Sequence, residues 1–115
     1  MSINQKAIIL NYKFALKASA GNDILAHNLL ALFVKQLPDY IKNINNALLT
    51  IDLATLQNNI HKLNGALKYI GAPSLSQQVS ELDGQIETLP PSNLVIKVNQ
   101  ILDSLENIRK EEKYQ

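Results

Sequence analysis

Histidine is the residue type in this chain best suited to nucleophilic chemistry, because the sequence contains no cysteine and two histidines, His27 and His61. At neutral pH much of an imidazole side chain is uncharged, and one ring nitrogen then has a free electron pair that can attack a phosphoryl group. If the segment around His61 is helical, residues three, four and seven positions on share its face, and these are Asn64, Gly65 and Lys68. The sequence therefore predicts that His61 lies on a polar, partly exposed strip.

Gly65 is the most informative neighbour of this histidine. Glycine inside a helix costs about 1 kcal/mol relative to alanine, and no turn is expected at this position. A bare helix surface one turn from an exposed imidazole would leave room for a docking partner. Lys68 would then hold phosphate oxygens as a point charge, and Asn64 would donate a hydrogen bond to them. Neighbouring positions are expected to support or border this face: Gln57, Asn58, Lys62 and Tyr69.

The second histidine, His27, lacks such surroundings, since no comparable glycine or cation lies near it in the sequence. We expect it to be a surface or boundary residue. A metal site is not expected, because two histidines on separate helices without adjacent carboxylates make a poor ligand set. A single histidine on a helix is commonly just a solvated side chain, so a role for His61 depends on the elements that carry it.

Apolar residues recur at alternating spacings of three and four, which keeps one face of an α-helix apolar. The pattern is clearest from Asp52 to Ile70, the segment that contains His61. It recurs from Leu75 to Leu89 and from Leu94 to Ile108, and an earlier segment from Leu25 to Leu48 shows it with one slip. Four such helices bury their apolar faces together in a bundle. The predicted fold is therefore all-α, an antiparallel four-helix bundle with a short additional N-terminal helix over residues 11–20.

Residues that begin and end helices divide the chain at matching places. Gly21 and Gly71 are expected to end helices in the left-handed conformation, and Pro38 predicts a kink inside the first long helix. Helix N-caps, whose side-chain oxygens accept free backbone N–H groups, are expected at Asn22 or Asp23, Asp52, Ser74 and Ser92.

Length and composition indicate one globular domain. The chain has 115 residues, of which 46% are hydrophobic and 18% charged, and its net charge of +1 argues against binding nucleic acid through the phosphate backbone. No apolar run is long enough to span a bilayer, so direct membrane contact is not expected. We expect a single domain over residues 1–115, with an N-terminal segment (1–21), the bundle (22–108) and a charged tail that frays (109–115).

The stretch around His61 resembles the histidine phosphotransfer (HPt) domains of bacterial hybrid sensor kinases, most closely the C-terminal HPt modules of tripartite kinases. The pattern of these domains is His-x-Leu-Lys-Gly, then a glycine six residues later usually followed by a small residue, and a leucine–acid pair that ends the next helix. The residues that match are His61, Leu63, Gly65, Gly71, Ala72, Leu75 and Leu82–Asp83. Residues 11–22 and 33–38 also resemble segments of these domains, so the similarity covers most of the chain.

The resemblance implies that His61 accepts a phosphoryl group from the receiver domain of a hybrid sensor kinase and passes it to the receiver domain of a response regulator. No autonomous kinase activity is expected, because the chain has no nucleotide-binding loop. The chain would bind no cofactor itself, and the partner receiver would supply Mg²⁺. The expected state is a cytoplasmic monomer, either freestanding or the C-terminal domain of an inner-membrane sensor kinase.

The sequence departs from the family pattern at Asn64, where HPt domains most often have lysine. Lys62 or Lys68 would have to replace that cation beside the phosphate. Two alternatives to phosphotransfer stay open from the sequence. The chain could be a helical bundle that binds receivers or other proteins without being phosphorylated, or a structural or dimerisation segment of a larger protein.

Overall fold

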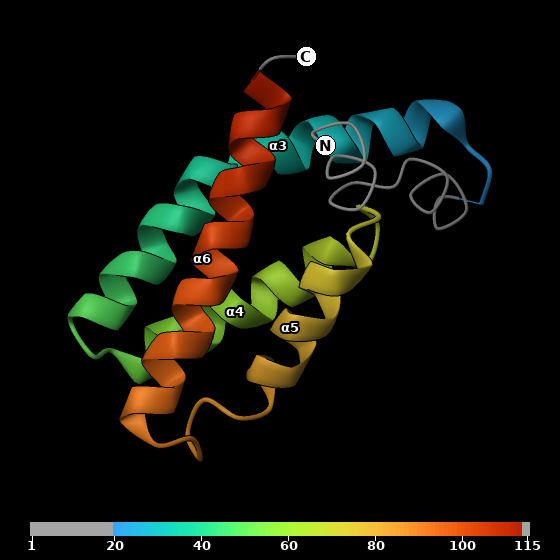
Figure 1. The fold of residues 1–115 in the computed structure, drawn as a ribbon. Coiled ribbons are helices and arrows are strands. Elements are labelled where there is room, and N and C mark those ends of the chain that lie inside the picture. Colours follow the sequence, from blue (N-terminus) through green and yellow to red (C-terminus); the bar gives the residue numbers. More distant parts are fainter. Residues whose placement is uncertain (1–19, 114–115) are drawn as a thin grey trace.

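The structure, a computed structural model, describes residues 20–113, and over this range it consists of four α-helices without a strand. Helix α3 packs against α4 and α6, and α5 packs against the same two helices, so the four enclose one core (Figure 1). The predicted four-helix bundle is confirmed, whereas the short helix predicted for residues 11–20 lies almost entirely outside the described residues. The helix bounds are α3 Asp23–Leu49, α4 Leu53–Leu67, α5 Pro73–Asp83 and α6 Pro91–Lys113.

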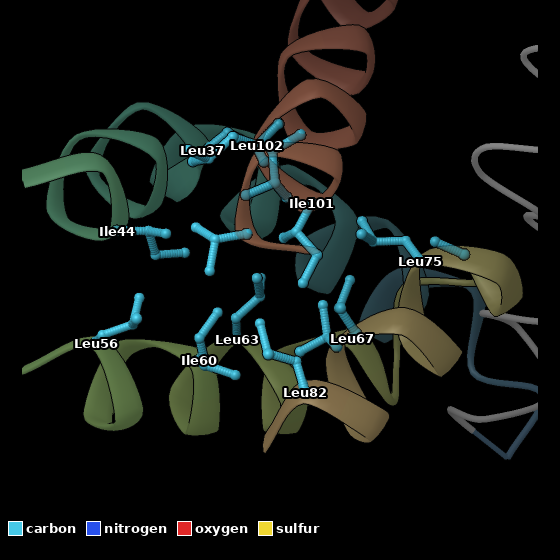
Figure 2. Close-up of a cluster of buried hydrophobic side chains, with 14 of the residues drawn as sticks. Leu37, Ile44, Leu56, Ile60, Leu63, Leu67, Leu75, Leu82, Ile101 and Leu102 are labelled. Carbon is cyan, nitrogen blue, oxygen red and sulfur yellow. The ribbon is translucent and has the colours of Figure 1, made fainter. Parts of the chain in front are cut away.

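Helix α4 contributes an uninterrupted apolar stripe to the core, as its three–four spacing predicts. Figure 2 shows these side chains directed toward Leu37 and Ile44 of α3 and Ile101 of α6. Burying each such side chain stabilises the fold by roughly 1.5–3 kcal/mol. The opposite face of α4 is consequently left for polar residues, including His61. The stripe, each member no more than 1% exposed, is Leu56, Ile60, Leu63 and Leu67.

Helix α3 changes direction part-way along its length, from the blue-to-teal first part to the green second part (Figure 1). Pro38 lies inside this helix and lacks the N–H that would bond to the preceding turn, so the predicted kink is confirmed. The stripe predicted for its first half is wrong. Leu25 and Leu32 are 43% and 50% exposed, whereas Ala26 and Phe33, one position further on, are buried. Both faces of this half carry apolar residues, so spacing alone did not identify the inner one.

The helix starts follow two different rules. Asn22 and Asp52 are N-caps, with side-chain oxygens that accept the backbone N–H of the third residue on, as predicted. The caps predicted at Ser74 and Ser92 are wrong, because both serines lie inside helices that begin one residue earlier, at a proline. Proline suits the first helical position, since its fixed φ is already helical and its missing N–H is not needed there.

Helix α5 ends at Asp83, six residues before the end that its apolar spacing predicts. Gln57 of α4 donates a hydrogen bond of 2.9 Å from Nε2 to the main-chain carbonyl of Asp83, taking the place of a further helical turn. Gly84 follows and is a poor helix former. Ile86 is still buried in the core, although it lies in the turns that lead to α6 and not in α5.

Helix α6 continues past Ile108 to Lys113, where a frayed tail was expected. Arg109 donates two hydrogen bonds of 3.0 Å to the carboxylate of Glu106, one turn earlier, and such pairs stabilise an exposed helix end. Gly21 and Gly71 both have φ of 76°, the left-handed conformation predicted for them. Among the described helices, none is long and apolar enough to cross a bilayer.

The Asp52 cap makes stability depend on pH. The hydroxyl and backbone N–H of Thr55 donate to its carboxylate at 2.7 and 3.1 Å, and these bonds lower the pKa of Asp52 below its ordinary value. A depressed pKa adds stability above the pKa of the unfolded chain, and that stability is lost as pH falls through the folded pKa. We expect Asp52→Ala to melt a few degrees lower than wild type at pH 7, with the gap closing in acid, measured by circular dichroism. If the difference in melting temperature between wild type and Asp52→Ala did not change with pH, the ionised Asp52 cap would not be the source of this stability.

Candidate functional site

His61 lies in the middle of α4 on the face turned away from the core, and its side chain is 75% exposed. Its Nδ1 lies 3.1 Å from Oδ2 of Asp83, the last residue of α5. Helices α4 and α5 form a hairpin, so the end of α5 returns to the level of the histidine. The nearest charged partner of His61 is therefore a carboxylate on the neighbouring helix, not one of the lysines on its own helix.

Two amides of α4 fix the Asp83 carboxylate. Gln57 Nε2 donates to Oδ1 at 2.7 Å as well as to the main-chain carbonyl, and Asn64 Nδ2 donates to Oδ2 at 3.1 Å. The Asp83 side chain is only 15% exposed, and its two oxygens accept three side-chain contacts, counting the imidazole. Asp83 is thus held in one orientation, directed at the ring of His61.

The contact with Asp83 determines which nitrogen of a neutral His61 carries the proton. An ionised carboxylate can only accept hydrogen bonds, so Nδ1 must be the N–H donor in this pair. The other ring nitrogen, Nε2, then holds the free electron pair. If the ring gains a positive charge, the same contact becomes an ion pair with Asp83. The arrangement is chemically an exposed nitrogen nucleophile supported by a carboxylate.

Gly65 lies one turn beyond His61 and is exposed. A Cβ atom built at this position would meet no atom within 4 Å, so the packing of the domain does not require glycine. Glycine here also costs about 1 kcal/mol in helix propensity. The fold therefore leaves this glycine unexplained, which fits the prediction that something outside the domain approaches the helix at this point.

The two lysines predicted to support a phosphate are exposed, and neither forms an ion pair with Asp83 in the described part of the chain. Lys62 lines a shallow hollow between α3 and α4 that it shares with Asn59. Lys68, after the end of α4, lines a separate open groove of about 480 Å³ between α4 and α5. Within residues 20–113, no cation forms an ion pair with the Asp83 carboxylate apart from His61 itself.

The remaining predicted residues take different places. Asn58 is exposed on α4, and Tyr69 is 46% exposed in the turn after it, so both can border a docking face. Gln57 is half-buried and holds Asp83 instead of facing a partner. His27 is exposed on the first turns of α3, with its Nε2 3.7 Å from a carboxylate oxygen of Asp23.

Comparison with known proteins identifies the family. The family model described as the Hpt domain matches residues 28–111. The chain belongs to the Hpt domain family. Members of this family carry a phosphohistidine in two-component phosphorelays, so the resemblance inferred from the sequence is confirmed.

A solved structure supports the same conclusion for the Hpt fold. The HPT domain from the Hpt sensor hybrid histidine kinase from Shewanella superposes with a TM-score of 0.85 at 28% sequence identity. The alignment covers 92% of this chain and 92% of that one. A search of curated proteins found no sequence match.

Asp83 is the residue of this Hpt domain that sequence reasoning did not assign to the site. The leucine–acid pair at Leu82–Asp83 was recognised as part of the pattern, but only as a helix ending. An acid at the end of one helix of a hairpin lies level with the middle of the other helix when the connecting turn is short. This alignment of α4 and α5 was the feature from which the contact between Asp83 and His61 could have been predicted.

Proposed function

We propose that His61 is the phosphoacceptor of this Hpt domain and that Nε2 is the atom that receives the phosphoryl group. The observation that supports this most directly is the 3.1 Å contact between Nδ1 and the Asp83 carboxylate, combined with a side chain that is 75% exposed. Such a contact with an ionised carboxylate supports a ring proton on Nδ1, which would leave Nε2 with its electron pair. Exposure then lets a partner bring phosphorus to that nitrogen.

The reaction is a displacement at phosphorus. The electron pair of Nε2 attacks the phosphoryl group of a receiver's aspartyl phosphate, the N–P bond forms and the P–O bond breaks, which returns the receiver's carboxylate. The Nδ1 proton stays on the ring, so the product is a positively charged phosphoimidazole paired with Asp83. Reversal on a second receiver restores neutral His61. The chain binds no cofactor in this scheme, and the magnesium ion belongs to the receiver's own site.

The proposed partners are the receiver domain of a hybrid sensor kinase and the receiver domain of a response regulator, which would use one face in turn. This docking face consists of His61, Gly65 and the exposed residues around them, Asn58 and Tyr69. It needs only one copy of the chain, so the proposed working form is a monomer. Its place would be the cytoplasm, where receivers are phosphorylated, either free or as the C-terminal domain of a membrane-bound sensor kinase.

The test is phosphoryl transfer from a purified receiver. The receiver is phosphorylated with acetyl phosphate and Mg²⁺, freed of the small donor, and mixed with the chain. We expect the chain to gain the mass of one phosphoryl group, acid-labile as phosphohistidine is, on the peptide that contains α4. Binding to the receiver without any mass gain would instead support a module that docks without being phosphorylated. If the chain neither bound nor gained mass with any of several receivers, the proposal would be contradicted.

A further inference from the structure

Asn64 interacts with His61 indirectly, through the carboxylate of Asp83. Its side chain is half-buried, and its Nδ2 donates to Oδ2 of Asp83 at 3.1 Å. The same oxygen lies 3.1 Å from Nδ1 of His61. One carboxylate oxygen therefore joins the amide to the imidazole. Because Asn64 is engaged with Asp83, its amide is not directed toward a group on the other side of the ring.

The charges around His61 are unfavourable for a phosphorylated ring. A phosphoryl group carries about −2 near neutral pH, and on Nε2 it would lie one imidazole ring away from the Asp83 carboxylate. Within the described residues, the only ion-pair partner of Asp83 is His61. Lys62 and Lys68 line hollows on other parts of the surface. Within the described residues, no lysine is therefore fixed beside His61 by an ion pair with Asp83.

We propose that Asn64, by holding Asp83 against Nδ1, makes the phosphorylated form of His61 a short-lived donor and not a store of phosphoryl groups. This inference rests on the function proposed above. Asp83 keeps the proton on Nδ1, so the phosphorylated ring stays cationic. When the N–P bond breaks, its electron pair returns to Nε2 and neutralises the ring, while the phosphorus bonds to a carboxylate oxygen of the next receiver, or to water. A cationic ring is the better leaving group, and Asn64 offers the phosphoryl group no positive charge that would slow its departure.

The first measurement is the half-life of the phosphorylated chain after removal of the receiver, followed at pH 7 by ³¹P NMR. We expect Asn64→Lys to lengthen the half-life about threefold or more, because an ammonium group near the phosphoryl group and Asp83 supplies the missing charge. The matched control is Asn59→Lys. Asn59 lies on the same helix, donates to the carbonyl of Thr55 and lines the hollow toward α3, so the same added charge there should leave the half-life unchanged.

The second measurement needs no phosphorylation and keeps the test valid if the lysine variant folds poorly. The ¹⁵N chemical shifts of the His61 ring report which nitrogen carries the proton. We expect the wild type to hold it on Nδ1, and Asn64→Ala to show a mixture of both neutral forms, because Asp83 loses one of its two amide donors. A merely structural role for Asn64 would lower the melting temperature without changing these shifts.

The outcomes separate this inference from the proposed function. A chain that is phosphorylated on His61, with equal half-lives in wild type and Asn64→Lys, overturns the inference and leaves the function standing. Ring shifts that are identical in wild type and Asn64→Ala overturn it as well. A wild type that is never phosphorylated overturns both, whatever the ring shifts show.

Discussion

Replacing His61 with glutamine is expected to reduce phosphoryl acceptance from a phosphorylated receiver at least about a hundredfold, to background. The amide nitrogen of glutamine has no free electron pair, so it cannot form the N–P bond. The variant should fold normally, because the His61 side chain is largely exposed and glutamine is a good helix former. The measurement is the rate at which the receiver loses label to the chain, with circular dichroism as the check on folding.

The matched control is His27→Gln. His27 is also exposed on a helix and also lies near a carboxylate, that of Asp23. It therefore tests whether any surface histidine of this chain accepts the group. We expect His27→Gln to accept phosphoryl groups at the wild-type rate. Wild-type acceptance by His61→Gln would show that the acceptor is wrongly assigned, and loss in His27→Gln would point to the other histidine.

Replacing Gly65 with leucine is expected to slow transfer from the receiver about tenfold or more while the domain stays folded. A Cβ at this position meets nothing within 4 Å, so the side chain has room in the isolated domain. It would project from the exposed face one turn from His61, into the space a docking partner needs. Leucine is also the better helix former, by about 1 kcal/mol, so we expect equal or greater stability in urea.

Gly65→Ala is the control for this effect. A single methyl group should give most of the gain in helix stability while leaving the approach to His61 largely open. We expect its transfer rate to stay near that of wild type. If Gly65→Leu transferred as fast as wild type, docking would no longer explain the glycine. If both variants were less stable than wild type, the glycine would be required by the fold itself.

The core of α4 could be predicted from sequence because its apolar residues occupy a single face. In the first half of α3 the same reasoning failed, since Leu25 and Leu32 form as regular a stripe as the residues that are actually buried. The choice between the two faces depends on how α3 bends over its neighbours, which is a property of the whole bundle. The missed helix starts have a local cause, because the prolines before Ser74 and Ser92 occupy the first helical position, so each helix begins at the proline and not after the serine.

Some residues of the candidate site could likewise be predicted from the sequence, and others could not. His61 and Gly65 were found because their arrangement lies within one helix, where spacing determines which side chains share a face. The role of Asp83 was missed because it depends on how two helices are aligned across a turn. Gln57 and Asn64 were expected to border or support the docking face, and their hydrogen bonds to Asp83 could not be predicted from their spacing to His61.

The hydrogen bonds of Gln57 couple the end of α5 to the position of the proton on the His61 ring. One amide group binds both the last main-chain carbonyl of α5 and the carboxylate that orients His61. Local opening of the final turn of α5 would therefore release the carboxylate and let the ring proton move between nitrogens. Helix ends are where such openings are most frequent. If His61 is the acceptor proposed above, fraying of the last turn of α5 would lower the population of the competent ring form. We therefore expect substitutions in that turn, other than at Asp83 itself, to change how fast the domain takes up its phosphoryl group.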